Sequence, residues 1–418
     1  MKKMLFTVLA FSLFFSFNMV WAEEESELSY WGWGPHVIGI NEEISPAFQK
    51  IHPGVKVQGI SMGPWDLMDK FYVAMVSGKG GPDCAQLVRR VSAKYLISEL
   101  LYDFTDFMKE HEGDFVDSLN RDVTSVDGKI LGIAVDYGPA VVYYNKELAD
   151  KLGIDVNSIV TWEDYYNVAV EVSKSHPDIY VQPLYYPGGS WGSNYWRLWA
   201  QSAGANIYDE HNKVIRDNEK IKAVTRFYHK LNTQVHVLKA PVNDPSIYDA
   251  LREGKLLFWP KNSYESGQLA QQVPEMEGKI YAFPWPLWSK DAPKYTGNWG
   301  GVALVVPKRG PHADIAAEFL KFFAINEEAL VSLWFTTSGV PAYKPARDKI
   351  MKITDRETFV KNLMKSIAVR EVGPWNYIDW SQTEKILGDA LDSMMAGSKT
   401  PDEAWEWTEN QLVKILGR

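Results

Sequence analysis

Short apolar runs alternate with longer amphipathic segments along most of this chain. The runs predict strands at 28–33, 55–60, 85–88, 130–135, 140–144, 181–185, 256–259, 280–283 and 301–306. The segments predict helices at 41–51, 66–77, 92–100, 162–175, 191–204, 219–231, 246–252 and 313–324, and the C-terminal third is almost all helical. In the first of these helices Ile44, Phe48 and Ile51 fall on one face. Alternation of this kind predicts an α/β fold with open, largely parallel sheets and helices on both faces.

Two of the predicted helices begin with residues that satisfy free backbone N–H groups. Thr161 is a good N-cap, and Asp164 three residues later completes a capping-box pattern. Thr400 precedes a proline and two acidic residues, the composition expected of a first helical turn. These signals predict helices that begin at Trp162 and Pro401.

The segment 127–144 combines a turn, two strands and a polar break. Asp127 and Gly128 predict a tight turn before the first strand. Asp136-Tyr137-Gly138-Pro139 then interrupts the apolar pattern, which resumes at Ala140. The break leaves a carboxylate and a phenol exposed between two apolar runs.

The N-terminal residues have the pattern of a secretory signal peptide. Lys2 and Lys3 form a basic start, an apolar stretch runs from Met4 to Val20, and Ala22 precedes three glutamates. The apolar stretch is short for a membrane-spanning helix and contains polar residues. We expect cleavage after Ala22 and, without a cysteine at that junction, a soluble mature protein that is periplasmic or secreted.

Length, charge and cysteine content exclude several classes of protein. A chain of 418 residues is too long for one hydrophobic core and predicts two domains. The formal net charge of −9 offers no basic face for nucleic acid or anionic lipid. The single cysteine, Cys84, excludes an internal disulfide and is expected to be a small buried apolar residue. The histidines form no metal-binding pattern, so we expect neither a metal nor a cofactor.

Aromatic residues are the unusual part of the composition. The chain has 17 tryptophans and 21 tyrosines, more than core packing needs, because tryptophan is large and seldom fully buried. Many of the tryptophans lie in polar, Gly- and Pro-rich breaks, where an indole offers a flat apolar face beside polar atoms. Sugar rings present C–H faces and hydroxyl groups, so such platforms suit a carbohydrate. Aromatic core filling is the alternative for each tryptophan.

Six motifs, in order, resemble those of one protein family. They are the F-x-K-x-x-P-G-h-K-V-like stretch 48–57, the SGKGPDV-like turn 77–83, the GK-to-YNK stretch 128–146 with TWED at 161–164, the GGVALVVPK strand 300–308, the SGVPA segment 338–342 and the TPDEA helix start 400–404. Their order and spacing resemble the carbohydrate-binding members of the ABC-importer extracellular solute-binding proteins (family 1, maltose-binding-protein-like). The resemblance extends over nearly the whole mature chain.

This resemblance implies a periplasmic-binding-protein fold, in which two α/β lobes with central sheets are joined by three crossings and hold the ligand between them. The crossings fall near 136–141, 299–303 and 339–343. The N-terminal lobe is then 23–137 plus 302–340 and the C-terminal lobe 138–301 plus 341–418, after a signal peptide at 1–22. The implied function is capture of a sugar, polyol or cyclitol by hinge closure and delivery to the permease of an ABC importer. We expect a monomer.

The candidate ligand-binding residues are aromatic, amide and carboxylate side chains near the implied cleft. They are Trp31, Trp33, Trp65, Asp136, Tyr137, Trp191, Asn194, Asn262, Tyr264, Trp299, Trp375 and Tyr377. An ionised carboxylate such as that of Asp136 is a strong acceptor for sugar hydroxyls. Asn262 and Tyr264 stand where the family usually has glycine and tryptophan, a departure that leaves the local geometry open, although a tyrosine still stacks.

Two other classes of function remain open on the sequence. A secreted glycoside hydrolase would also carry aromatic platforms, but it needs two carboxylates that flank the scissile bond, and Asp136 is the one acid placed in the cleft. A peptide- or polyamine-binding relative is the third possibility. A polyamine site would need several acids among its aromatics, where this chain has mostly amides.

Overall fold

The computed structural model describes residues 26–89, 93–96, 100–116, 119, 123–125, 127–184, 190–241, 244–353, 358–376 and 380–416. The predicted signal peptide and its cleavage site lie outside these residues. Within these ranges no helix combines the length and the apolar character needed to cross a membrane.

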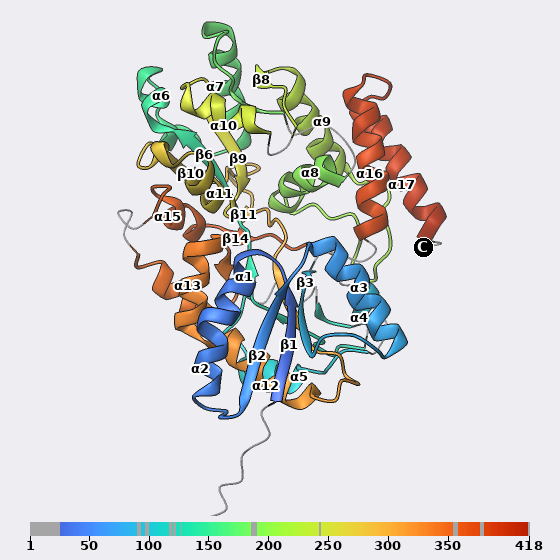
Figure 1. Cartoon of the computed structure of the whole chain (residues 1–418). Helices are drawn as coiled ribbons and strands as arrows, with labels where there is room; N and C mark the ends of the chain where they lie inside the picture. Colours follow the sequence, from blue (N-terminus) through green and yellow to red (C-terminus); the bar gives the residue numbers. More distant parts are fainter. Residues whose placement is uncertain are drawn as a thin grey trace, which may run out of the picture.

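Strands and helices follow one another along the chain as the alternation predicts (Figure 1). The strands are β1 (Ser26–Gly32), β2 (Val55–Ser61), β3 (Cys84–Val88), β4 (Ile133–Ala134), β5 (Asp136–Tyr137), β6 (Ala140–Asn145), β7 (Gln182–Pro183), β8 (Val237–Leu238), β9 (Phe258–Asn262), β10 (Ile280–Pro284), β11 (Tyr295–Thr296), β12 (Val302–Val305), β13 (Val340–Pro341) and β14 (Glu371–Val372). The helices are α1 (Gly34–Gly39), the π-helical turn η1 (Ile40–Ile44), α2 (Ser45–Gln49), α3 (Pro64–Ser77), α4 (Ala93–Leu96), α5 (Thr105–Glu110), α6 (Lys146–Lys151), η4 (Val156–Ser158), α7 (Trp162–Ser175), α8 (Ser190–Ser202), α9 (Glu219–Thr233), α10 (Pro245–Arg252), α11 (Glu265–Gln272), η5 (Pro274–Met276), α12 (Ala313–Ile325), α13 (Glu327–Thr337), α14 (Lys344–Ile350), α15 (Leu363–Ala368), α16 (Trp380–Met395) and α17 (Pro401–Leu416).

A five-stranded sheet forms the centre of one half of the molecule. Its strand order is β2-β1-β3-β12-β4, with β1 parallel to β2 and β3, and β12 antiparallel to β3 and β4. Alternation along β1 buries Leu28 and Tyr30 completely and leaves Ser29 and Trp31 partly exposed. Cys84 is fully buried in β3, which confirms its prediction as a small buried residue.

A smaller sheet of order β10-β6-β9 lies in the other half and is antiparallel throughout. The prediction of largely parallel sheets is therefore wrong for this sheet, although β7 and β8 nearby are parallel to each other. The physical reason is that β6 leads away from the first crossing, whereas β9 runs back towards it and ends at Asn262 opposite Ala140, so the two strands pair antiparallel. Every residue of β6 is buried, in agreement with a run of apolar and aromatic residues from Ala140 to Tyr144 that does not alternate with polar ones.

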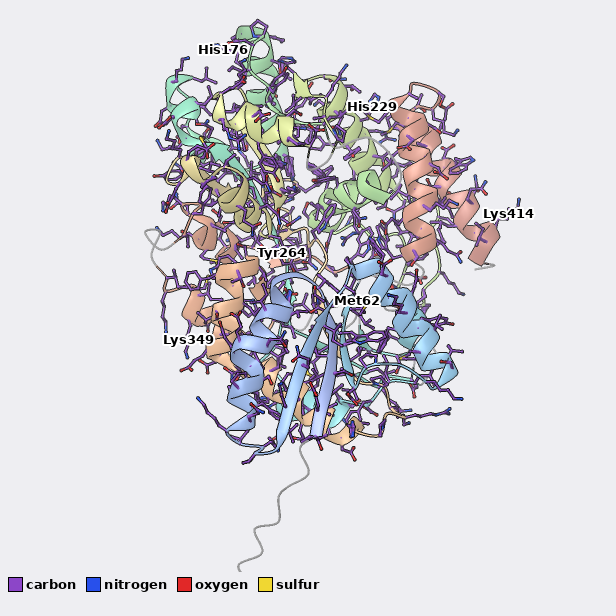
Figure 2. All side chains as sticks on the ribbon, viewed as in Figure 1. Met62, His176, His229, Tyr264, Lys349 and Lys414 are labelled. Atoms are coloured by element: carbon purple, nitrogen blue, oxygen red, sulfur yellow. The ribbon has the colours of Figure 1, made fainter. Side chains whose placement is uncertain are left out.

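The three predicted crossings lie side by side where the two halves meet. β5 pairs with β13, and Pro139 forms an isolated bridge with Asn298. Figure 2 shows Tyr264 and Met62 at the level of this junction and His176 at one far end of the molecule. The residue bounds of the two lobes stay a prediction. Helix α14 contacts α13 and β13, which favours a third passage of the chain between the two halves after α14 instead of at 339–343.

Helix boundaries follow the local capping signals closely. Thr161 and Asp164 form the predicted capping box of α7, and α17 begins at Pro401. The segment predicted as one helix at 41–51 is helical up to Gln49, but η1 and α2 divide it, the helical stretch begins earlier with α1, and Ile51 is 58% exposed beyond the helix end. Pro46, at the start of α2, has no N–H for the regular hydrogen-bond ladder, which accounts for the break at this point.

Many tryptophans fill the core of the half that contains α7 and α8. Trp162 lies 4.7 Å from Trp285 and 5.2 Å from Trp199, measured between ring centroids. All three are fully or almost fully buried. Core filling therefore accounts for these rings, as it does for Trp196, which stacks on Trp405.

Candidate functional site

A cavity of about 610 Å³ lies where the two halves of the molecule meet. Its walls come from the residues that follow β1, the first turn of α3, α11, the second crossing and the last turn of α13. Ligands of α/β proteins bind at the carboxyl ends of strands, and Trp33 directly follows the carboxyl end of β1. The volume is within the range of about 300–1,000 Å³ that is usual for small-molecule sites.

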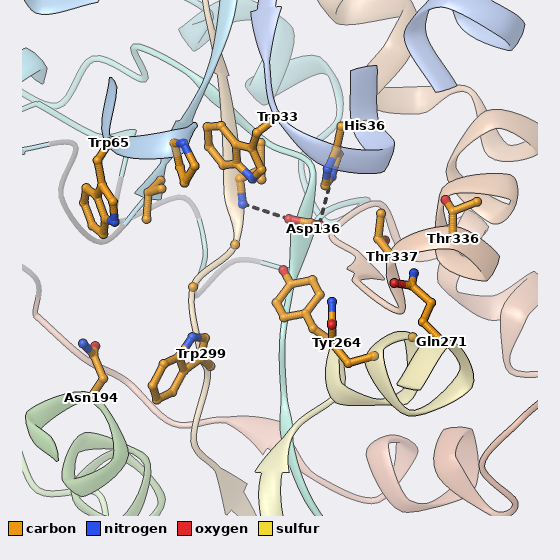
Figure 3. A pocket seen from close by; sticks show the side chains of 17 residues that line it. Trp33, His36, Trp65, Asp136, Asn194, Tyr264, Gln271, Trp299, Thr336 and Thr337 are labelled. Atoms are coloured by element: carbon orange, nitrogen blue, oxygen red, sulfur yellow. Dashed lines mark hydrogen bonds and ion pairs between the residues drawn. The ribbon is translucent and has the colours of Figure 1, made fainter. Parts of the chain in front are cut away.

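Three tryptophans form the aromatic part of the wall: Trp33, Trp65 and Trp299 (Figure 3). Trp65 is 55% exposed at the start of α3, where packing does not require an indole. Trp299 packs against Tyr195, with 4.9 Å between ring centroids, and precedes two glycines of positive φ. These glycines allow the backbone to turn without a side chain between Trp299 and the cavity.

Asp136 lies at the centre of the site and is 4% exposed. Its Oδ1 accepts a hydrogen bond of 2.8 Å from the Val302 N–H, and its Oδ2 lies 3.3 Å from His36 Nε2. The Tyr264 side chain lies beside the same carboxylate. Both carboxylate oxygens thus face protein groups, so Asp136 also joins separate segments of the chain.

Tyr264 stands beside Asp136 at the start of α11 (Figure 3). Burial, reinforced by the neighbouring Asp136 carboxylate, holds the pKa of the Tyr264 phenol well above its usual range. The hydroxyl therefore remains protonated at neutral pH. Asn262 Oδ1 accepts the Tyr264 N–H at 3.1 Å and fixes the backbone at this position.

The remaining polar wall is made of neutral side chains. Asn194 is oriented by a 2.7 Å hydrogen bond from its Nδ2 to Glu384 Oε1, a carboxylate of α16. Five residues that were not predicted from the sequence also line the cavity: His36, Gln268, Gln271, Thr336 and Thr337. A signal was present for two of them, because Gln268 and Gln271 follow Tyr264 at helical spacing. The threonines directly precede the SGVPA motif at 338–342.

The charge of the wall is low. Among the described residues that line the cavity there is no lysine or arginine, and Asp136 is the one carboxylate. The guanidinium of Arg89, which does not line the cavity, packs against Gly301 and donates to the Gly300 carbonyl at 2.9 Å. The described part of the chain also contains no group of histidine, cysteine and acidic residues that could hold a metal ion.

The structure brings six of the predicted site residues together around this cavity: Trp33, Trp65, Asp136, Asn194, Tyr264 and Trp299. Their contact with a ligand stays a prediction. Trp191 and Tyr377 cannot be compared, because the side chain of Trp191 and the whole of Tyr377 lie outside the described residues.

Four other predicted residues do not line the cavity. Trp31 lies in a separate surface groove beside Asp69 and Lys70. Tyr137 is buried in the core because alternation along β5 turns it away from Asp136. Asn262 is buried, and its side-chain oxygen accepts a hydrogen bond from the backbone N–H of Tyr264. Trp375 is buried against Trp380, with 5.7 Å between ring centroids.

Comparison with known proteins agrees with this architecture. Residues 33–329 match the family model of the bacterial extracellular solute-binding proteins, and the chain belongs to that family. It is 25% identical over 411 residues to the arabinooligosaccharide-binding protein of Bacillus subtilis (strain 168). The aligned region covers 93% of this chain and 92% of the relative.

Two solved structures share the fold. One is the sugar-binding protein MalE from the phytopathogen Xanthomonas citri, with a TM-score of 0.78 and 16% sequence identity. The superposition covers 94% of this chain and 98% of the MalE chain. The maltose-bound MalE3 of T. maritima gives a TM-score of 0.73 at 17% identity and covers 93% of this chain and 99% of its own. The fold is thus that of the MalE-like binding proteins, with two α/β lobes.

Proposed function

We propose that this protein captures a neutral carbohydrate in the cavity between its two halves and delivers it to the permease of an ABC importer. Capture would occur outside the cytoplasm and proceed by closure of the two halves around the ligand. The protein would act as a monomer whose closed form the permease recognises. Membership in the extracellular solute-binding family supports the location and the partner.

The observation that carries the proposal is the chemistry of the cavity wall. Three tryptophans supply flat apolar surfaces, and amide and hydroxyl side chains supply neutral donors and acceptors around them. A sugar ring matches both, since its C–H faces stack and its hydroxyls hydrogen-bond. An anionic ligand would lack a cation in this wall, since no lysine or arginine is among its described residues.

The size of the cavity and the relatives favour an oligosaccharide over a single ring. A volume of about 610 Å³ has room for more than one pyranose or furanose ring. The protein of Bacillus subtilis named for arabinooligosaccharide binding aligns with nearly the whole chain. Arabinooligosaccharides are therefore the first ligands to test.

The residues of the cavity wall support binding of the sugar without hydrolysis. A glycosidase needs two carboxylates on either side of the bond, and Asp136 is the one carboxylate among the described residues of the wall. A polyamine would need several such acids. Peptide binding is the remaining alternative and is decided by experiment.

The test is a titration of the protein, first stripped of bound ligand by unfolding and refolding. Calorimetry and intrinsic fluorescence would follow binding of arabinooligosaccharides, maltooligosaccharides, galactobiose, pentitols, cyclitols, a peptide mixture and spermidine. We expect saturable binding of at least one carbohydrate and no product on prolonged incubation. Sugar release would identify a hydrolase, and a response confined to peptides or spermidine would overturn the carbohydrate proposal.

A further inference from the structure

The ring of Tyr264 occupies a slot whose two edges are glycines from segments far apart in the chain, one in the first crossing and one directly before β13. A Cβ placed on Gly138, in the first crossing, would lie 2.4 Å from Cε2 of Tyr264. A Cβ placed on Gly339, directly before β13, would lie 2.7 Å from Cε1 of the same ring and 2.5 Å from Asp136 Oδ2. Neither glycine has a positive φ, so close approach of the ring and its neighbours, and not backbone conformation, requires glycine at both positions.

The second crossing also borders this slot. The hypothetical Cβ of Gly138 would also lie 2.7 Å from the carbonyl oxygen of Trp299, and the Trp299 N–H bonds the Gly138 carbonyl at 2.9 Å. The Tyr264 side chain also lies beside Asp136, whose Oδ1 accepts a hydrogen bond from Val302 at the end of that crossing. One aromatic side chain thus lies against the first crossing, the second crossing and the segment that leads into β13.

Tyr264 itself is held firmly from the opposite side. It joins β9 to α11, and Lys261 and Glu265, on either side of it, form a buried ion pair. Glu265 also accepts a hydrogen bond of 3.1 Å from Tyr248. The ring therefore moves with the three-stranded sheet, while the slot that receives it belongs to the crossings.

We infer that Tyr264 is a hinge clamp that also lines the ligand cavity. The inference rests on the proposed function, because it concerns closure of the same two halves. A rotation of one half relative to the other must shift the ring within a slot that has no spare space at its edges. Tyr264 thereby restricts the inter-lobe angle, and a ligand that touches its exposed part acts directly on the hinge. Figure 3 shows the ring between Asp136 and Trp299, where a ligand would meet it.

The experiment measures the distance between the two halves without any ligand. Spin labels are attached through Lys50→Cys, after α2, and Lys174→Cys, in α7, because both lysines are exposed and α2 and α7 lie at opposite ends of the molecule (Figure 1). Cys84 is fully buried and stays unlabelled. Pulsed electron paramagnetic resonance then gives the distance distribution for wild type, Tyr264→Phe, Tyr264→Ala and the control Tyr102→Ala. Tyr102 is a half-buried tyrosine that packs on Phe104, away from the crossings.

We expect Tyr264→Ala to broaden the distribution by about twofold or more, because the slot is then empty and more lobe angles become accessible. Tyr264→Phe and Tyr102→Ala should keep the wild-type width, since the first retains the ring and the second leaves the slot intact. A folded Tyr264→Ala protein with the wild-type distribution would overturn the inference even if sugars bind. Broadening would support it even if no sugar in the panel binds, so the two proposals fail separately.

A second measurement distinguishes the contact between Gly339 and the Tyr264 ring from a general loss of packing. Gly339→Ala is introduced into the wild type and into Tyr264→Ala, and the thermal midpoints are compared. In the wild type the added methyl meets both the ring and Asp136 Oδ2, the latter at 2.5 Å, whereas without the ring it meets the carboxylate alone. The fall in midpoint should therefore be smaller in the Tyr264→Ala background. Equal falls in both backgrounds would contradict the clamp.

Discussion

Trp31 and Trp33 illustrate how little the type of a residue says about its role. The two are separated by one residue and have the same side chain, and the sequence analysis assigns both to the cleft. Trp31 still belongs to β1 and faces the groove beside α3, whereas Trp33 follows the end of the strand and lines the cavity. Where the strand ends decides between the two environments.

This difference gives a matched pair of substitutions. Trp65→Ala should weaken carbohydrate binding by about tenfold or more, because a stacking surface is lost, and should change stability little, because the side chain is 55% exposed. Trp31→Ala should leave affinity within about twofold, since Trp31 lines a different groove. Calorimetric titration with the sugar identified in the panel measures both. Equal losses for the two variants would place the ligand outside the described cavity.

Helix ends are the elements that local sequence specifies best. The capping box of α7 needs only Thr161 and Asp164, three residues apart, and it forms as predicted. The Asp164 carboxylate accepts the Thr161 N–H at 2.8 Å, and the Thr161 hydroxyl accepts the Asp164 N–H at 3.2 Å. No distant residue is required, so the signal can be recognised without the fold.

Replacement of Thr161 tests the contribution of this cap. Thr161→Ala removes the acceptor for the Asp164 N–H and should lower the free energy of unfolding by about 1 kcal/mol. Thr233→Ala is the control. Thr233 is the last residue of a different helix, α9, and its exposed hydroxyl donates to the His229 carbonyl of that helix instead of accepting a free N–H at a helix start. Urea denaturation of both variants makes the comparison. Similar small effects would show that α7 is held by packing alone.

Helix α11 depends instead on a charge pair that the fold buries. Lys261 and Glu265 have side chains only 6% and 2% exposed. Lys261→Met would leave Glu265 buried without its cation, and the expected loss is about 3–5 kcal/mol. The double variant Lys261→Met/Glu265→Gln should lose less, because no unpaired charge remains. Denaturant unfolding measures both, and a double variant no more stable than Lys261→Met would contradict this account.

At the scale of the whole molecule, burial of tyrosines links stability to alkaline pH. Burial raises the pKa of Tyr144 to about 12 and holds the pKa values of Tyr30 and Tyr165 well above their usual range. In the unfolded chain these phenols lose their protons near pH 10, while in the folded chain they keep them. The unfolded state then binds fewer protons, so stability should be level below about pH 10 and fall above it.

Denaturant midpoints between pH 8 and pH 11, with absorbance at 295 nm, check this expectation. The midpoint should fall above about pH 10, and the buried tyrosines should ionise together with unfolding. Tyr144→Phe should reduce the slope above pH 10, because one raised pKa is removed. A midpoint that stays level while tyrosinate absorbance rises in the folded protein would contradict the assignment.

The sequence by itself determined the alternation of strands and helices, the capped starts of α7 and α17, and the family, because these depend on residues close together in the chain. It also supplied six of the residues around the cavity, since Trp33, Trp65, Asp136 and Trp299 lie at breaks after strands or at helix starts. The tertiary structure alone decided that the smaller sheet is antiparallel and that Tyr137 and Trp375 face the core. It alone brought Gly138, Gly339 and Tyr264 together. The reason is physical: the contacts of Tyr264 with Gly138 and Gly339, and the pairing of β5 with β13, join residues far apart in the chain, and their geometry follows from how the two halves pack rather than from any local preference.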